Sequence, residues 1–337
     1  MNRRRFLKES FAFSAVATLG SFSGVAAIAT AGPKTADLLM LGDWGDENPT
    51  AQFVVATAMR DYLGRNALTP QALLMLGDNW YGDLAGGTRS LRWRTQFEEM
   101  YPASEFACRA YGILGNHDYQ MAPMSKADVE LAYAHGGRSR FTMPGRWYSF
   151  QFPAKDPLIT FIALDSNVPE GDGAGGRKPG IDRNGFMTMT PDQKAEQLSW
   201  LEIELRKRPT TPFLAVLAHH PVYSDGPHGD HATLIQDWDP LFRKHRVHLY
   251  LAGHDHDLQH LEFENHPTSF FLSGAGGADL YNLKINSLQR GPYAQKVYGF
   301  SHLSVSEQAM TLRHVDATGR ILHTFSKTPE GITRIVR

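Results

Sequence analysis

Seven short runs of apolar residues place the strongest restriction on the fold of this 337-residue chain. Each run is nearly continuous in apolar residues, which is typical of strands in a sheet that is covered on both faces. The runs occupy residues 37–44, 72–79, 108–116, 158–166, 213–220, 248–255 and 269–276. Segments with helical character separate them, at residues 50–66, 90–101, 125–134, 190–208 and 231–245. This alternation predicts an α/β fold with a largely parallel central sheet.

Capping and turn residues support this division into elements. Thr190 is a favoured helix N-cap, Pro191 suits the first helical position, and Gln193 completes a capping box. Near the C-terminus, residues 300–326 alternate apolar and polar positions around an Asp-Ala-Thr-Gly turn. This alternation predicts an antiparallel hairpin that follows the parallel part of the fold.

Residues 1–31 have the pattern of an export signal. Arg3 and Arg4 stand in a basic segment, which is followed by a weakly apolar stretch over residues 11–30 and by the small residues Ala29-Thr30-Ala31. The pattern resembles a twin-arginine signal, which implies export of the folded protein by the twin-arginine translocase to the periplasm or beyond. The alternative is a transmembrane anchor. We predict no stable membrane anchor, because serine, threonine, glycine and alanine make the stretch too weakly apolar.

Composition narrows the range of partners. The chain has 34 basic and 35 acidic residues, so no excess of positive charge points to nucleic acid or to a membrane surface. Cys108 is the only cysteine, which excludes an intramolecular disulfide and a thiolate metal cluster. Glycine-rich stretches at 171–180 and 274–277 lack the strand-to-helix context of a phosphate cradle, so we interpret both as surface loops. No linker or repeat divides residues 32–337, which we interpret as one domain.

Five of the apolar runs end on aspartate, asparagine or histidine. In open α/β sheets the carboxyl ends of the strands meet at the ligand crevice. One such residue alone is usually a turn residue or a helix cap. Five in one chain indicate a common site rich in metal ligands. The sequences at these ends are Gly-Asp-Trp-Gly at 42–45, Gly-Asp-Asn-Trp-Tyr at 77–81, Gly-Asn-His-Asp at 115–118, Ala-His-His-Pro at 218–221 and Gly-His-Asp-His at 253–256.

This ordered set of motifs resembles the calcineurin-like metallophosphoesterase superfamily. Tyr81, three residues after Asp78, matches the tyrosine of the purple acid phosphatases, and the likeness is greatest to their small, tartrate-resistant type. The resemblance runs the length of the mature chain. It implies a four-layer α-β-β-α sandwich, in which two mixed β-sheets pack face to face between helices.

The resemblance also implies a pair of metal ions and the residues that hold them. Asp43, Asp78, Tyr81 and His256 correspond to the ligands of the first ion. Asp78, Asn116, His219 and His254 correspond to the ligands of the second, so that Asp78 bridges both. Carboxylate and phenolate oxygens suit Fe³⁺, whereas imidazole and an amide oxygen suit Fe²⁺, Zn²⁺ or Mn²⁺.

Two further histidines correspond to residues that contact the substrate in this family. His117 follows Asn116, and His228 lies nine residues after His219. The resemblance assigns them to the phosphate and the leaving group. The predicted activity is hydrolysis of small-molecule phosphate monoesters, at acidic pH, by a metal-bound hydroxide.

Three alternatives remain at this stage. A phosphodiesterase or nucleotidase of the same superfamily would use a different metal pair. A non-catalytic metal- or phosphate-binding protein of the cell envelope is disfavoured, because every ligand position is filled. Iron-dependent redox chemistry is compatible with an iron pair, but no residue selects it.

Overall fold

The computed structural model describes residues 35–121, 123–169, 187–207, 209–284 and 290–336. The expected export signal and the glycine-rich stretch 171–180 lie outside the described residues. The signal at 1–31 and the single domain over 32–337 therefore stay predictions.

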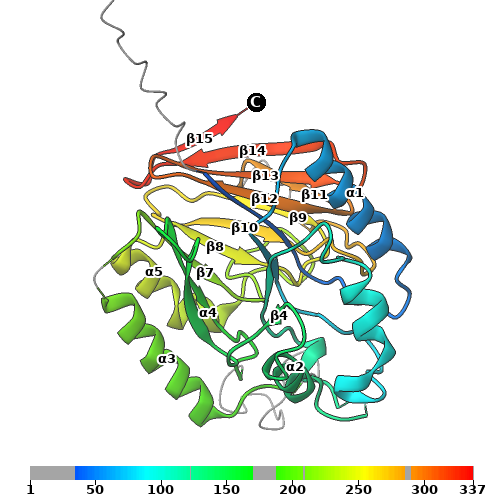
Figure 1. The fold of residues 1–337 in the computed structure, drawn as a ribbon. Helices are drawn as coiled ribbons and strands as arrows, with labels where there is room; N and C mark the ends of the chain where they lie inside the picture. The colour runs from blue at the N-terminus through cyan, green and yellow to red at the C-terminus, as the bar shows by residue number, and fades with distance from the viewer. Residues whose placement is uncertain (1–34, 122, 170–186, 208, 285–289, 337) are drawn as a thin grey trace, which may run out of the picture. The chain divides into compact units, whose positions relative to one another are not determined.

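Two mixed β-sheets form the centre of the described fold (Figure 1). The first sheet has the strand order β15-β14-β13-β12-β1-β2-β3-β4. Its strands are β1 Ala36–Leu41, β2 Ala72–Met75, β3 Arg109–Gly112, β4 Phe141–Thr142, β12 Gly299–Val305, β13 Met310–Asp316, β14 Ile321–Lys327 and β15 Thr333–Val336. The second sheet has the order β11-β9-β10-β8-β7-β6-β5. Its strands are β5 Tyr148–Phe152, β6 Ile159–Ala163, β7 Phe213–Leu217, β8 Leu249–Ala252, β9 Leu258–Leu261, β10 Ser269–Ser273 and β11 Tyr293–Gln295.

Each sheet combines a parallel part with an antiparallel part. Strands β1 to β4 pair in parallel, and so do β6, β7, β8 and β10. Strand β12 is antiparallel to β1, and the strands β12, β13 and β14 form an antiparallel ladder that includes the predicted hairpin. The parallel strands place the loops at their carboxyl ends along one edge of each sheet, where the motif residues lie.

Both faces of the second sheet are buried, because alternate residues enter different cores. Phe161 and Phe271 face the first sheet and join the core between the two sheets. Their neighbours Ile162 and Phe270 belong to a second core with residues of the helices. Strands covered on both sides explain the nearly continuous apolar runs of the sequence.

Helices complete the four layers (Figure 1). Helix α1 Thr50–Asn66 covers the outer face of the first sheet, where the Tyr62 hydroxyl bonds Nδ1 of His302 on β12 at 2.9 Å. Helices α3 Pro191–Arg206, α4 Ala232–Asp237 and α5 Asp239–His245 pack their apolar residues into the outer core of the second sheet. Near the β4 edge of the first sheet lie α2 Lys126–His135, the 3₁₀ turns η1 Gly87–Arg89 and η3 His117–Tyr119, and the π-helical turn η2 Trp93–Glu98. The predicted α-β-β-α sandwich is confirmed.

The structure corrects several element boundaries. The helix predicted over 231–245 is broken at Trp238, and Pro240 stands in the first turn of the second piece, where its missing N–H is not needed. The helix predicted over 90–101 is a π-helical turn. The stretch 274–277, predicted to be a surface loop, is buried beside the strand ends.

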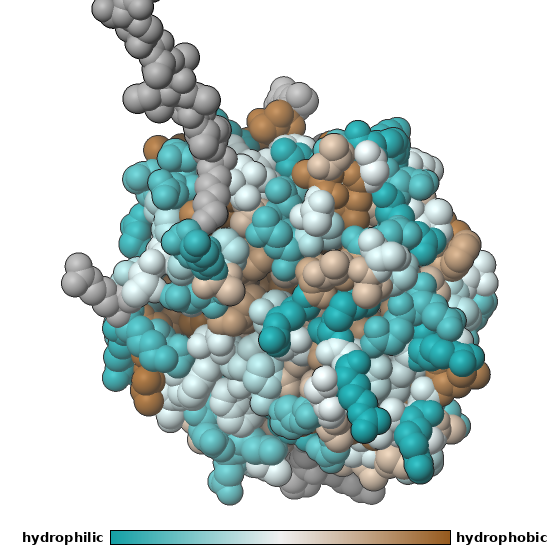
Figure 2. All heavy atoms as spheres, in the orientation of Figure 1, coloured by the Kyte–Doolittle hydropathy of each residue, from teal (hydrophilic) through white to brown (hydrophobic). Residues whose placement is uncertain are grey.

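On the face shown in Figure 2, apolar residues form separate small patches between polar ones.

Three histidines lie within the core between the sheets. The His314 ring stacks on Phe271 with centroids 3.8 Å apart, and Nδ1 of His260 lies 2.9 Å from Nε2 of His323. The other nitrogen of His260 bonds Glu262 at 2.8 Å. Burial and, to a smaller extent, charge repulsion from His260 lower the pKa of His323 to about 3. Burial also lowers the pKa of His260 and of His314.

These histidines predict a loss of stability in acid. The unfolded chain binds a proton near the ordinary histidine pKa of 6.5, whereas folded His323 binds one only near 3. Between these values acid favours the unfolded state, with a slope of about 1.4 kcal/mol per pH unit for each such histidine. His323→Phe keeps the ring, so urea titrations between pH 4 and 6 should show this slope reduced by about one proton. The exposed His135→Gln serves as control and should leave the slope unchanged; an unchanged slope in both variants would contradict the assignment.

Candidate metal centre

Loops after five strands bring the seven predicted ligands together. Asp43 follows β1, Asp78 and Tyr81 follow β2, and Asn116 follows β3. His219 follows β7, and His254 and His256 follow β8. All seven are buried. Two groups have ligand atoms that all lie within 4.8 Å of one another: Asp43, Asp78 and His256, and Asp78, His219 and His254.

The backbone at these positions is strained. Asp43, Asp78 and His254 have φ values of 58°, 48° and 71°, a left-handed conformation that side-chain-bearing residues rarely adopt. Strands β1 and β2 end at Leu41 and Met75, before the motif residues. The apolar runs predicted strands that include these residues. Gly115 permits a close approach of the chain, because a Cβ there would lie 2.2 Å from Oδ1 of Asp78. A left-handed backbone conformation costs free energy, and residues held in one cluster at functional sites.

Asp118 ties the loops after β2 and β3 together. Its carboxylate accepts hydrogen bonds from the main-chain N–H groups of Asn79 at 3.1 Å, Trp80 at 3.0 Å and Gly115 at 2.8 Å. Burial and the nearby charge of Asp78 raise the pKa of Asp118 to about 6. The two loops that carry Asp78 and Asn116 are thus fixed to each other through one buried side chain.

The Tyr81 hydroxyl is surrounded by more acceptors than it can satisfy. It lies 3.1 Å from Oδ1 of Asp43, 3.0 Å from Oδ2 of Asp78 and 3.0 Å from Nε2 of His256. Nδ1 of His256 donates to the Asp279 carbonyl at 2.6 Å, so neutral His256 presents a lone pair at Nε2. One phenolic proton cannot serve three acceptors. Burial raises the pKa of Tyr81 well above its usual value, and both carboxylates raise it further, so its ionisation requires a cation.

His219 and Asn116 lie on the other side of Asp78. Nδ1 of His219 donates to the Leu76 carbonyl at 2.8 Å, which leaves Nε2 directed at Oδ2 of Asp78, 3.4 Å away. Burial lowers the pKa of His219, but Asp78 and Asp43 outweigh it and raise the value to about 10. The side-chain oxygen of Asn116 is buried and has no hydrogen-bond partner within the described part of the chain. Such an oxygen is costly unless something binds it.

These residues fit two cations. Asp78 belongs to both groups of candidate ligands. Burial raises its pKa, but His219 and His117 outweigh that effect and hold the pKa below its usual range, so the carboxylate is ionised. Against the effect of burial, the neighbouring carboxylates raise the pKa of His219 and of His256, so protons on these two rings balance the charge in the bare protein, and metal ions would displace them.

Both predicted catalytic histidines border the same cavity as these residues. The cavity measures about 280 Å³. The main-chain N–H of His117 donates to Oδ1 of Asp78 at 2.8 Å, and its ring lies 4.2 Å from that of Tyr81. The ring of His228 lies 4.1 Å from that of His254 on the opposite side. The lining residues are Asp78, Asn116, His117, His228, His254, His256 and Tyr281.

Sequence reasoning missed two residues of this site. Asp255 is fully buried and accepts a 2.6 Å hydrogen bond from Nδ1 of His228. Its position between two predicted ligands in Gly-His-Asp-His is the sequence feature that could have indicated its place in the site. Tyr281 stacks on the His256 ring, with centroids 3.9 Å apart and an angle of 12°. No motif marks Tyr281, because it follows the stretch that was interpreted as a surface loop.

A two-sheet sandwich with carboxylate, phenol, amide and imidazole groups at its strand ends defines a metal-dependent hydrolase of the two-ion type. The model of the calcineurin-like phosphoesterase family matches residues 36–258, which is more than half of the chain. The chain belongs to the calcineurin-like phosphoesterase family, as its motifs predicted.

Individual relatives agree with the predicted subgroup. Mouse tartrate-resistant acid phosphatase type 5 is 29% identical over 311 residues, which cover 87% of this chain and 90% of that protein. Among solved structures, the anchor GAP50 of the inner membrane complex of Plasmodium is similar with a TM-score of 0.67 and 18% identity, over 86% of this chain and 87% of that one. The purple acid phosphatase PPD1 of yellow lupin has a TM-score of 0.60 and 17% identity, over 88% and 54%. The two structures support the fold alone, and the acid phosphatase named first agrees with the predicted activity.

Proposed function

We propose that this chain is a two-metal acid phosphatase that hydrolyses phosphate monoesters. The observation that carries the proposal is the convergence of Asp43, Asp78 and His256 on the Tyr81 hydroxyl, at 3.0–3.1 Å. The unpartnered oxygen of Asn116 supports a second cation beside the first. The names of the relatives support the reaction and its acidic pH.

The donor chemistry supports different ions at the two positions. Asp43, Tyr81, His256 and one side of Asp78 form the set suited to Fe³⁺, because a phenolate stabilises the trivalent ion. Asn116, His219, His254 and the shared Asp78 suit Fe²⁺, Zn²⁺ or Mn²⁺. When bound, such a pair polarises a phosphate ester and makes a nearby water more acidic.

The histidines of the cavity supply the proton chemistry. Asp255 accepts from Nδ1 of His228, which fixes the ring on the wall of the cavity. A histidine that lines the cavity in a fixed orientation suits a group that gives a proton to the leaving oxygen. His117 lies across the cavity and is proposed to contact the phosphate.

The first test separates ligands from catalytic groups. Asp78→Ala should lower bound metal to well under two ions per chain and abolish hydrolysis of 4-nitrophenyl phosphate, because both ions lose a ligand. His228→Ala and His117→Ala should keep the metal and lower kcat/KM by roughly 10²–10⁴. Metal analysis and kinetics across pH measure both effects.

Two results would count against the proposal. If the Asp78→Ala protein retains two metal ions and most of its turnover, Asp78 is not a ligand that the two ions share. Faster hydrolysis of bis(4-nitrophenyl) phosphate than of the monoester would favour the phosphodiesterase alternative.

A second test concerns the identity of the first ion. Tyr81 bound to Fe³⁺ as phenolate should give a charge-transfer band in the visible spectrum and a violet protein. Tyr81→Phe preserves the ring and removes the oxygen, so the band should vanish and iron should be held less tightly, with unchanged circular dichroism. The buried Tyr148→Phe is the matched control and should keep the colour. A wild-type protein that is colourless when loaded with oxidised iron would contradict Tyr81 as a ligand.

Export is proposed on the sequence alone. Arg3, Arg4 and the weakly apolar stretch that follows support passage through the twin-arginine translocase to the periplasm or the medium. Among the described residues, no helix combines the length and the apolar character that a membrane span requires. Replacing both arginines with lysine should retain the precursor in the cytoplasm, as followed by cell fractionation. Unchanged export of that variant would refute the assignment.

A further inference from the structure

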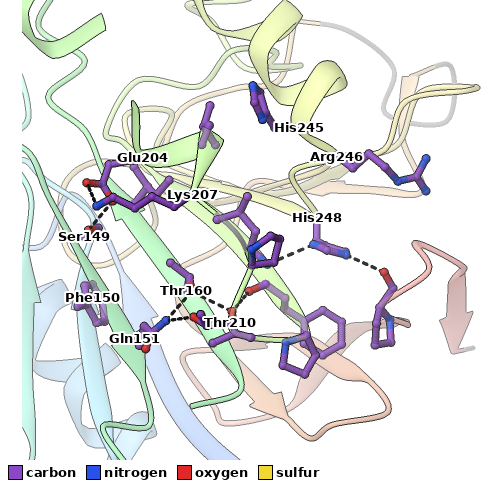
Figure 3. A pocket seen from close by; sticks show the side chains of 18 residues that line it. Ser149, Phe150, Gln151, Thr160, Glu204, Lys207, Thr210, His245, Arg246 and His248 are labelled. Carbon is purple, nitrogen blue, oxygen red and sulfur yellow. Dashed lines mark hydrogen bonds and ion pairs between the residues drawn. The ribbon is translucent and has the colours of Figure 1, made fainter. Parts of the chain in front are cut away.

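A larger cleft, seen from close by in Figure 3, is lined by residues at the end of the second sheet opposite to the strand ends that carry the metal centre. Its volume is about 600 Å³, within the range of small-molecule sites. It is lined by residues from the start of β6 and β7, such as Thr160 and Phe213, whereas His219 follows the end of β7. Six residues of extended chain separate Phe213 from His219, or roughly 20 Å.

The C-terminal end of helix α3, which ends at Arg206, forms part of the wall through Glu204, Leu205 and the following Lys207. Pro212 and Leu214 line it with partly exposed apolar side chains, and the buried Ile162 and Leu205 lie among the other lining residues. Figure 3 shows Glu204 and Lys207 on one side of the cleft, and His245 and Arg246, from the end of α5, on another.

Most polar groups in the walls bind one another. Ser149 and Lys207 both bond Glu204, so that carboxylate is already neutralised. Nδ1 of His248 accepts from the Leu214 N–H at 3.2 Å, and Nε2 donates to the Pro329 carbonyl at 2.9 Å. His248 is therefore a neutral ring with both nitrogens occupied.

The remaining charge at the cleft is positive. Near the ends of α3 and α5, Arg206, Lys207 and Arg243 are each paired with a carboxylate. Lys244 and Arg246 have no carboxylate partner within the described ranges. Within the part of the chain that the structure describes, the Arg246 guanidinium donates to one main-chain oxygen, that of Glu330, at 3.3 Å. Burial lowers the pKa of His245, and the charges of Lys244 and Arg206 lower it as well.

We propose that this cleft binds a small amphipathic anion. The apolar body of the ligand lies on Pro212 and Leu214, which are partly exposed, and its single anionic group pairs with Arg246 at the rim. An aliphatic carboxylate has this chemistry. The site is independent of the phosphatase reaction, because its lining shares no residue with the metal centre.

Isothermal titration of the full chain with decanoate, below its micelle concentration, tests the site. Arg246→Gln removes the ion pair and should weaken decanoate binding by at least about tenfold. Thr210→Trp places a large side chain into the cleft from an exposed loop and should abolish binding. Lys244→Gln removes an equal charge from the same helix end outside the cleft, and should change affinity by less than about twofold, because exposed charges are screened.

Decylamine and decanol serve as ligand controls, since they carry the same chain with a positive charge or with none. Both should bind more weakly than decanoate. The proposal is overturned if decanoate does not bind, if decylamine binds as tightly, or if neither Arg246→Gln nor Thr210→Trp weakens binding.

Discussion

The carboxylate of Asp78 is the point on which the rest of the site depends. It is buried, it is ionised, and it is shared between the Tyr81 hydroxyl on one side and the His219 ring on the other. A buried negative charge among further lone pairs is unfavourable unless cations are held nearby. The described residues around it offer histidines and the two tyrosines Tyr81 and Tyr281, and no lysine or arginine lines the cavity within the described ranges. Because folding brings these donor groups together, the folded protein is expected to bind metal ions more tightly than the unfolded chain does.

The fold maintains this arrangement through strain and through buried polar contacts. Three of the candidate ligands have left-handed backbone conformations, which persist only where the surroundings determine them. Asp118 helps to hold these conformations, because its carboxylate accepts hydrogen bonds from three main-chain N–H groups of two loops. Both sheets, covered by helices outside and packed on each other inside, form a rigid support for the loops at their edges.

Fold and activity are separable in this architecture. One structure with the same fold is described as an anchor in a membrane complex, and another as a purple acid phosphatase. The two-sheet sandwich therefore does not decide the chemistry. In this chain the proposed activity rests on the candidate donors that follow the strands and on His117 and His228, which line the same cavity, and not on the sandwich itself.

The sequence by itself determined the apolar strands, the order of the motifs and the types of donor atom, because these depend on local pattern and residue chemistry. The capping residues Thr190 and Gln193 predicted the start of helix α3. The motifs predicted which seven residues the fold brings together. It could not determine where each strand stops, because the turns at Asp43 and Asp78 depend on contacts with distant loops. It also missed the break at Trp238, the burial of residues 274–277, and the roles of Asp255 and Tyr281. Only the tertiary structure decided these, since they arise where segments far apart in the chain pack against one another and exclude water.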